Sequence, residues 1–190
     1  RICRHYDILV IADEIATGCG RTGDMWACDA LDFEPDIICT GKGLTAGYCG
    51  HAATITNHKV YDAFYSDDPE HALMHGPTFM GNPTATAVAS ASIKLLMSPH
   101  YLDNIKRIER QLVKLLSGFQ HPNITDIRIF GAIGVIEVRD TSILKDVQDH
   151  AVRKGVWLRP FRNIIYTAPP YIITDNELEK VVSAMKAIFE

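Results

Sequence analysis

Three short hydrophobic runs in the first third of the chain predict β-strands of one sheet. DILVIA (residues 7–12) and PDIICT (35–40) are almost continuously apolar, and HAATITN (51–57) follows the second run closely. Runs of this kind are typical of parallel strands that are buried on both faces. A turn-rich segment and a short amphipathic stretch between the first two runs provide enough chain for a crossover connection. The pattern therefore predicts part of a mainly parallel, doubly wound α/β sheet.

Asn82 and Pro83 suit the cap and the first residue of a helix. This helix is predicted to continue over residues 84–97, a segment that is rich in small side chains. After the Pro99 step, a second helix carries hydrophobic residues on one side and ends at Gly118. This hydrophobic side consists of Ile105, Ile108, Leu112, Leu115 and Leu116.

The last third alternates between strand-like and helical segments, which predicts a small α+β domain. The expected elements are strands at 126–130 and 134–138, a helix through residues 143–151 that stops at Gly155, extended segments at 155–161 and 163–173, and a final helix. Thr174 and Glu177 have the spacing of a capping box for that helix. We therefore divide the chain into residues 1–98 and residues 99–190.

Composition excludes several classes of function. The chain has 190 residues, 47% of them hydrophobic, and its formal net charge of −4 comes from interspersed charges. It has no basic stripe, so neither a nucleic acid nor a membrane is expected as a partner. Its five cysteines show no Cys-x-x-Cys spacing, which favours reduced thiols in the cytoplasm over a disulfide framework. Its eight histidines form no ligand set, and no metal site is expected.

Lys42 stands between two glycines in ICTGKGLTAG (38–47), directly after the second predicted strand. A phosphate-binding loop is excluded, because that motif needs a glycine in place of Asp36 and a hydroxyl residue in place of Gly43. A lysine in an ordinary turn is the simple alternative. At the end of a buried strand, however, a lysine has a lowered pKa and becomes a nucleophile towards aldehydes. The flanking glycines would then leave room for a flat ring against the backbone.

Asp13 ends the first predicted strand and is expected beside Lys42 at the carboxyl ends of neighbouring strands. An aldehyde cofactor with a pyridine ring needs an anion at its ring nitrogen, and Asp13 suits that role. The alternative for Asp13 is an acidic residue in the first turn of a helix, where the helix dipole favours negative charge.

Several ordered motifs resemble those of a known family. VIADEIATGCGRTG (10–23), PDIICTGKGLTAG (35–47) and HGPTFMGNP (75–83) are similar to motifs of the class III, fold-type I pyridoxal-phosphate aminotransferases. The resemblance covers nearly the whole chain. It implies that residues 1–98 are the C-terminal part of the large cofactor-binding domain, and that 99–190 are the small C-terminal domain.

By that resemblance, Lys42 binds pyridoxal 5'-phosphate covalently and Asp13 holds its pyridinium nitrogen. Thr78, with Pro77 beside it, matches a residue that binds the cofactor phosphate across the interface of a homodimer. From the residues alone, a hydroxyl after a rigid proline turn suits a phosphate, although an ordinary proline turn is the alternative.

The resemblance also implies substrate contacts. Gly76 matches a substrate-contacting position, Arg159 matches an arginine that takes the substrate carboxylate, and Phe161 lies against the same pocket. An arginine can bind a carboxylate through a two-pronged pair of hydrogen bonds, although a surface ion pair is its commoner role. Phe161, Trp157 and Tyr166 could line a pocket for an alkyl chain or pack in the core.

Within the family, GAIGVIEV (131–138) and GVWLRPF (155–161) are most similar to the branch of biotin biosynthesis. That branch transfers an amino group from S-adenosyl-L-methionine, or in some members lysine, to 8-amino-7-oxononanoate. Ala16, where many relatives carry glutamine, favours this branch. The alternatives are another class III aminotransferase of the ω-amino acid or ornithine type, and a non-catalytic fragment that keeps the fold.

The family also has a long N-terminal portion that supplies a phosphate loop and aromatic residues, whereas this chain starts at Arg1 just before a strand. We expect that portion to lie on the same precursor or on a partner chain, because an unfinished sheet exposes an edge. By itself the chain is expected to be inactive.

Overall fold

The computed structural model describes all residues from Arg1 to Glu190, and the chain forms two compact units. The first unit consists of Arg1–Cys19 and Asp24–Ser98, and the second consists of Gly20–Gly23 and Pro99–Glu190. Four residues of the glycine-rich turn therefore belong with the C-terminal half of the sequence. That these units correspond to the large and small domains of an aminotransferase stays a proposal.

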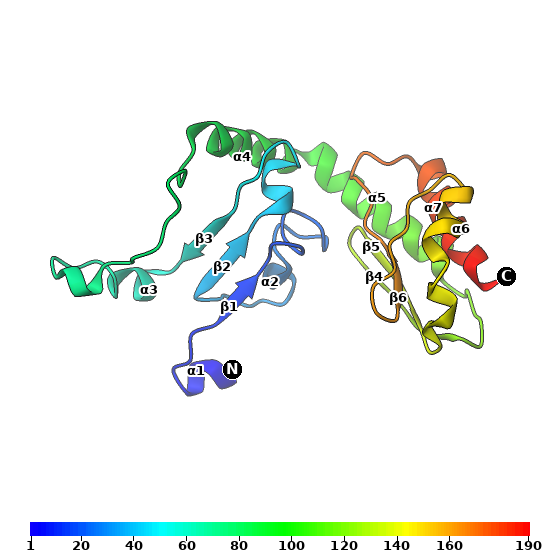
Figure 1. The fold of residues 1–190 in the computed structure, drawn as a ribbon, viewed down its shortest axis with the longest axis horizontal. Coiled ribbons are helices and arrows are strands. Elements are labelled where there is room, and N and C mark those ends of the chain that lie inside the picture. Colours follow the sequence, from blue (N-terminus) through cyan, green and yellow to red (C-terminus); the bar gives the residue numbers. More distant parts are fainter. The chain divides into compact units, whose positions relative to one another are not determined.

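The first unit contains a three-stranded sheet in the order β1-β2-β3 (Figure 1). β1 (Ile11–Asp13) and β2 (Ile37–Thr40) are parallel, as the crossover between them predicted. β3 (Ala53–Thr56) is antiparallel to β2. The connection from β2 to β3 (residues 41–52) contains only the 3-10 helix η1 (Lys42–Thr45), and no α-helix that could form the crossover of a parallel pair.

The prediction that the first hydrophobic run is buried on both faces is wrong. Ile8 and Ile11 are 54% and 61% exposed, and only the end of the run forms a strand. The physical reason is the position of β1 at the edge of the sheet, where β2 is its one neighbour. A hydrophobic run identifies residues that would gain from burial, and it does not ensure that this chain supplies the covering layer.

The helices of the first unit are short except for α4. They are α1 (Ile2–His5), α2 (Ala27–Ala30), the 3-10 helix η1 (Lys42–Thr45), α3 (His58–Asp62), the 3-10 helix η2 (Pro69–His71) and α4 (Pro83–Leu96). The side chain of Asn82 caps α4 by accepting a hydrogen bond from the Ala85 N–H at 3.1 Å, which confirms the predicted start. α4 packs against η1 through small residues such as Ala85 and Ala89, both buried.

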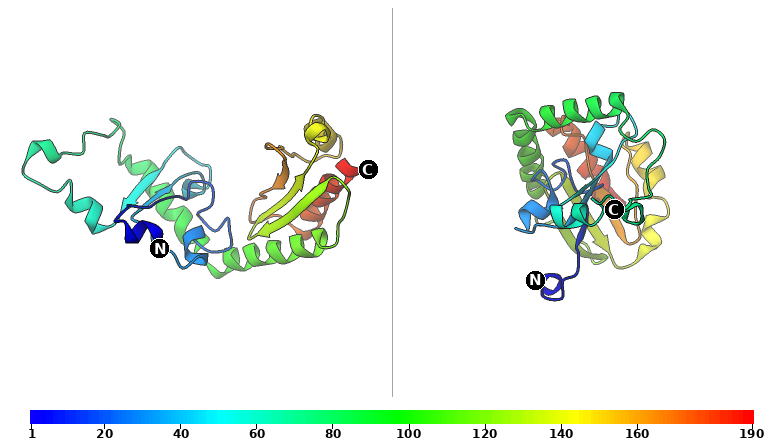
Figure 2. Two further views of the ribbon diagram at one scale, coloured as in Figure 1. Left: turned by 90° about the horizontal axis from the view of Figure 1, so that it is seen from below. Right: turned by 90° about the vertical axis from the view of Figure 1, so that its left-hand side faces the viewer.

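The second unit is an antiparallel sheet in the order β4-β5-β6, with helices α5 and α7 packed on one face (Figure 2). The strands are β4 (Ile124–Phe130), β5 (Ile133–Val138) and β6 (Ile164–Thr167), and the helices are α5 (Pro99–Leu116), α6 (Val147–Arg153) and α7 (Asp175–Lys186), with 3-10 helices η3 (Thr141–Leu144) and η4 (Ala187–Phe189). The predicted hydrophobic side of α5 forms the core, since Ile105, Ile108, Leu112 and Leu116 are fully buried.

In the second unit, the sequence predicted the start of α7 correctly and the helix before it incorrectly. Thr174 and Glu177 form the expected capping box at the start of α7. The helix expected through residues 143–151 is instead divided into η3 and α6. The side chain of Asp140 accepts a hydrogen bond from the Ser142 N–H, which starts a separate turn before α6 begins.

Candidate active site

Asp13 and Lys42 lie at the same edge of the first sheet. Asp13 is paired with Cys39 in the parallel β1–β2 ladder, and Lys42 follows Cys39 by three residues at the start of η1. Both side chains are exposed. The carboxyl ends of adjacent parallel strands therefore present an acid and an amine together, which is where α/β sheets bind ligands.

Asp13 is the last residue of β1 and belongs to no helix, so the helix-turn alternative is wrong. One of its carboxylate oxygens accepts a hydrogen bond from the Ile15 N–H at 3.1 Å. This contact leaves most of the carboxylate open for another donor, since each carboxylate accepts several hydrogen bonds.

Lys42 differs from the prediction in its burial. Its side chain is exposed, although β2, which it follows, is the central strand of the sheet. Its backbone has a φ of 43°, in the left-handed region that residues with a side chain seldom adopt. Strain of this kind concentrates at functional sites, where the surrounding structure enforces it. The turn thus imposes on Lys42 a conformation that an ordinary exposed lysine would avoid.

The two flanking glycines have different roles. A β-carbon on Gly43 would lie 3.0 Å from the β-carbon of Cys19, so the space beside Gly43 is filled by the glycine-rich turn. The room that Gly43 would leave for a ring stays a prediction. A β-carbon on Gly41 would make only ordinary contacts of 3.6 Å, with Ala52 and Ile15.

Glu14, next to Asp13, is a buried carboxylate that the sequence did not single out. It is only 3% exposed, and its carboxylate accepts hydrogen bonds from the Thr17 hydroxyl and from the Cys28 N–H. Burial raises the pKa of Glu14, but hydrogen bonds from Thr17, Cys28 and Ala27 together hold the pKa below its ordinary value. Glu14 is thus held in its ionised form inside the loop that follows β1.

Two buried cysteines lie near Glu14 in the sequence, Cys19 in the glycine-rich turn and Cys28 in α2. Burial raises the pKa of Cys19, and the negative charge of Glu14 adds to this effect while a hydrogen bond with Thr40 opposes it. Burial also raises the pKa of Cys28, as does its hydrogen bond with Glu14. Buried thiols with raised pKa values are poor nucleophiles, so these two cysteines are not candidates for a catalytic thiol.

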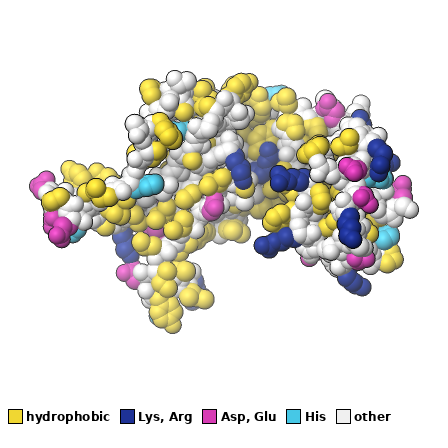
Figure 3. Space-filling view, in the orientation of Figure 1, with side chains coloured by type: hydrophobic (Ala, Val, Ile, Leu, Met, Phe, Trp, Pro, Cys, Tyr) yellow, Lys and Arg dark blue, Asp and Glu magenta, His cyan; other side chains and the backbone are white.

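Gly76, Pro77 and Thr78 lie in an extended segment of the first unit, shortly before α4. Every residue from 61 to 84 is exposed. The Pro77 carbonyl accepts a hydrogen bond from the Met80 N–H at 2.9 Å, so a turn does follow the proline. Hydrophobic side chains gather along this segment, as Figure 3 shows for the part of the chain that follows α3.

Arg159 and Phe161 lie in the second unit, in the extended segment that leads to β6. Trp157, Arg159 and Phe161 are exposed, whereas the intervening Leu158 is 2% exposed. This alternation places the arginine and the two aromatic residues on one side of the segment. The guanidinium of Arg162 lies 5.3 Å from the centre of the Phe161 ring.

Arg21 from the glycine-rich turn makes structural contacts within the second unit, to which the sequence assigned no role. Its guanidinium donates to the Pro169 carbonyl at 2.7 Å and lies 4.6 Å from the centre of the Tyr171 ring. The Ala132 N–H donates to the Arg21 carbonyl at 3.1 Å. The motif GCGRTG carried the only signal, because it places an arginine between glycines that permit close approach.

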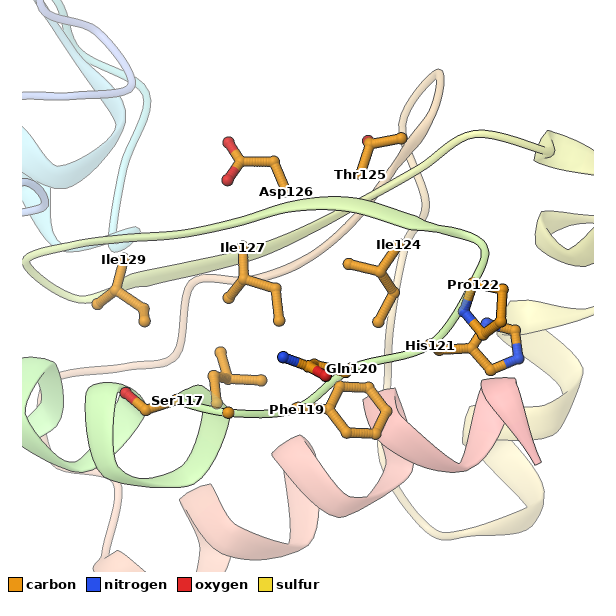
Figure 4. Close-up of a pocket in the computed structure, with 12 residues that line it drawn as sticks. Ser117, Phe119, Gln120, His121, Pro122, Ile124, Thr125, Asp126, Ile127 and Ile129 are labelled. Atoms are coloured by element: carbon orange, nitrogen blue, oxygen red, sulfur yellow. The ribbon is translucent and has the colours of Figure 1, made fainter.

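A cavity of the second unit, with a volume of about 810 Å³, lies between β4 and the loop after α5 (Figure 4). Ile124, Ile127 and Ile129 point towards that loop and Phe119, whereas Asp126 points to the other face of the strand. None of the predicted site residues lines this cavity. No cluster of histidine, cysteine and acidic side chains in the described residues could hold a metal ion. Among the helices, none combines the length and the hydrophobicity that a membrane span requires.

Two comparisons with known proteins agree on the family to which this chain is similar. The sequence pattern of the family described as aminotransferase class-III matches residues 1–189. The adenosylmethionine-8-amino-7-oxononanoate aminotransferase of Buchnera aphidicola subsp. Acyrthosiphon pisum is 45% identical over 185 residues, which cover 97% of this chain and 43% of that protein.

Two solved structures are similar in fold. The adenosylmethionine-8-amino-7-oxononanoate aminotransferase from Methanocaldococcus jannaschii has a TM-score of 0.88 at 31% identity, covering 98% of this chain and 47% of its own. An amine transaminase from an uncultivated Pseudomonas species, in its PLP-bound form, has a TM-score of 0.90 at 32% identity, covering 99% and 46%. The predicted fold class is confirmed, and the chain spans less than half the length of these relatives.

Proposed function

This chain belongs to the class-III aminotransferase family, and on that premise we propose that it supplies the lysine-bearing half of a pyridoxal-phosphate-dependent aminotransferase. The proposed reaction moves an amino group from S-adenosyl-L-methionine to 8-amino-7-oxononanoate, giving 7,8-diaminononanoate in biotin biosynthesis. The name of the relative at 45% identity supports this choice of reaction. The observation that carries the proposal is the placement of Asp13 and Lys42 at the ends of adjacent parallel strands.

The residues at this edge fit pyridoxal 5'-phosphate. An exposed amine and an exposed carboxylate stand at neighbouring strand ends, and Gly41 puts no side chain beside the lysine. When bound, the cofactor supplies an aldehyde that reacts with amines and a protonated ring that withdraws electrons. Lys42 would hold the aldehyde carbon through its amine, and Asp13 would keep the ring nitrogen protonated.

Lys42 has a second role in the proposed mechanism. When the amino donor is bound in the site, the free amine of Lys42 would act as a general base and remove the proton from Cα of the donor. The same amine would hold that proton and could return it within the site. Overall, the donor would exchange its amino group for a carbonyl oxygen from water, and the reverse exchange would aminate the keto acid and release water, in a ping-pong sequence.

Arg159 and its neighbours would bind the substrates. The exposed guanidinium of Arg159 is free to take the carboxylate of the keto acid through two parallel hydrogen bonds. Trp157 and Phe161 lie on the same side of the segment and offer an apolar surface for an alkyl chain. Gly76 would allow the substrate to approach the backbone of the extended segment.

A homodimer with shared sites is part of the proposal. Residues 61–84 are exposed throughout, and their large hydrophobic side chains include Met74, Phe79 and Met80. Exposed hydrophobic surfaces of this kind mark protein interfaces. A second subunit would cover the segment, and Thr78 with Pro77 would meet the cofactor phosphate of that subunit. The five free cysteines favour a cytoplasmic enzyme.

A second candidate is an amine transaminase with another pair of substrates. The TM-score of 0.90 to the Pseudomonas enzyme favours it as strongly as the fold favours the biotin enzyme. Turnover of 8-amino-7-oxononanoate with S-adenosyl-L-methionine or lysine, compared with simple ω-amines, separates these candidates.

The test is Lys42→Ala in the full-length protein. The variant is expected to lose turnover and the visible absorbance of bound pyridoxal phosphate, because no other group forms the covalent bond. A matched control, Lys59→Ala, removes an exposed lysine of the same unit that pairs with Asp7 and should keep both. Retained turnover in Lys42→Ala would end the assignment.

A further inference from the structure

We propose that Glu14 is a positioning residue that fixes the direction of the Asp13 carboxylate, by tying the end of β1 to the glycine-rich turn and to the start of α2. This inference rests on the proposed function, since it gives Asp13 its role at the cofactor ring. Glu14 itself touches neither the cofactor nor a substrate in this scheme.

The backbone of Glu14 is held on two sides. Its N–H donates to the Cys39 carbonyl of β2 at 2.8 Å, which continues the parallel ladder beyond Asp13. Its carbonyl accepts from the Gly18 N–H at 2.9 Å, which closes the turn after the strand. The residue next to Asp13 therefore belongs to the sheet and to the turn at once.

The side chain of Glu14 makes the third attachment. One carboxylate oxygen accepts from the Cys28 N–H at 2.9 Å, and the other accepts from the Thr17 hydroxyl. Cys28 lies in the first turn of α2, where N–H groups have no partner within the helix. The Glu14 carboxylate supplies a partner for the Cys28 N–H.

Burial and strand geometry connect this attachment to Asp13. Successive residues of an extended strand point to opposite sides. Glu14 is buried and Asp13 is exposed, so anchoring the side chain of Glu14 inwards directs that of Asp13 outwards. If Glu14 came loose, the Asp13 carboxylate would lose its fixed direction at the strand end.

A carboxylate at position 14 does what other residues cannot. Both of its oxygens accept hydrogen bonds, whereas the amide of glutamine offers one acceptor and one donor. Glu14→Gln keeps the shape and the bond from Cys28, and it weakens the bond from Thr17. Glu14→Leu keeps a similar volume and removes both hydrogen bonds to the carboxylate.

The experiment uses the full-length protein and pyridoxal phosphate as the probe. Glu14→Leu is expected to raise the dissociation constant of the cofactor about tenfold or more, and Glu14→Gln by less, as expected for lost hydrogen bonds to a charged group. The turnover number should fall while KM for the keto acid stays the same, because Arg159 lies on a different segment.

A double-mutant cycle separates positioning from a general loss of stability. In an Asp13→Asn background, Glu14→Leu should add little to the loss of cofactor affinity, since the carboxylate that it positions is already gone. The matched control is Glu177→Gln in α7, whose carboxylate also accepts from a threonine hydroxyl and a backbone N–H. It should destabilise its helix without changing cofactor affinity.

Additive losses in the cycle, or unchanged cofactor affinity in Glu14→Leu, would overturn the inference. If Glu14→Leu does not fold, the same double-mutant cycle is measured with Glu14→Gln or Thr17→Val in its place. Hydrogen exchange without cofactor decides separately whether Glu14 holds the loop, since the amides of Gly18 and Cys28 should exchange faster in the variants. If the wild-type protein binds no cofactor, the proposed function fails, whatever the exchange result.

Discussion

At the scale of single residues, Arg159 offers the clearest test of substrate binding. Arg159→Ala is expected to raise KM for the keto acid about thirtyfold, which corresponds to about 2 kcal/mol for removing one partner of a charge pair. Steady-state kinetics with varied keto acid measures the effect. Arg153→Ala, which removes another exposed arginine of the same unit, should leave KM unchanged. An unchanged KM for Arg159→Ala would move the carboxylate site elsewhere.

Gly131 is a residue for which the structure allows no side chain. Its φ is 55°, and a β-carbon would lie 2.3 Å from the backbone nitrogen of Gly23. Gly131→Ala should therefore lower the free energy of unfolding by about 3 kcal/mol, because a rigid backbone must move. Gly118→Ala is the control, since it has a φ of 76° but open space, and should cost about 1 kcal/mol. Chemical denaturation compares the two, and equal losses would contradict the steric explanation.

The sequence predicted the positions of Asp13 and Lys42 better than it predicted the residues that pack around them. Asp13 and Lys42 could be placed because each follows a hydrophobic run, and the register confirms that their strands are parallel neighbours. Glu14 could not be chosen over Asp13 by pattern, because only the fold decides which of two adjacent acids is buried. The contact of Gly43 with Cys19 likewise depends on how the turn folds back. The roles of all the predicted site residues stay predictions, namely those of Asp13, Lys42, Gly76, Pro77, Thr78, Arg159 and Phe161.

At the scale of elements, the capping box of α7 predicts a dependence of stability on pH. Hydrogen bonds from the backbone and hydroxyl of Thr174 hold the pKa of Glu177 below its ordinary value. A carboxylate whose pKa is lower in the folded state contributes stability above its unfolded pKa, of about 4.3, and this is lost as the pH falls through the folded pKa.

Thr174→Ala should lower the free energy of unfolding by about 1 kcal/mol at neutral pH. Its deficit should shrink on acidification below about pH 4, since protonation weakens the same contacts in the wild type. Denaturation at several pH values measures both effects. A deficit that stays constant down to acid pH would show that Glu177 and Thr174 act independently.

Elements with strong local signals were predicted well, and elements that depend on partners were not. The caps of α4 and α7 and the hydrophobic side of α5 are local patterns, and all three are confirmed. The direction of β3 and the exposure of β1 depend on connection length and on neighbouring strands. A single run of hydrophobic residues contains neither kind of information.

At the scale of the whole molecule, the exposed segment of residues 61–84 predicts a dimer. Phe79 is 75% exposed, and Phe79→Ala should raise the dimer dissociation constant about thirtyfold if it is a central interface residue worth about 2 kcal/mol. Analytical ultracentrifugation of the full-length protein measures this constant. Leu31→Ala, which removes an equally exposed side chain after α2, is the control. Equal effects of the two substitutions would place the interface elsewhere.

The most direct measurement is reduction of the full-length protein with borohydride in the presence of pyridoxal phosphate, followed by peptide mass mapping. The account predicts a single stable adduct on the peptide that contains Lys42, and none after Lys42→Ala. An adduct on another lysine, or no adduct while turnover persists, would contradict the claim that this strand end holds the cofactor.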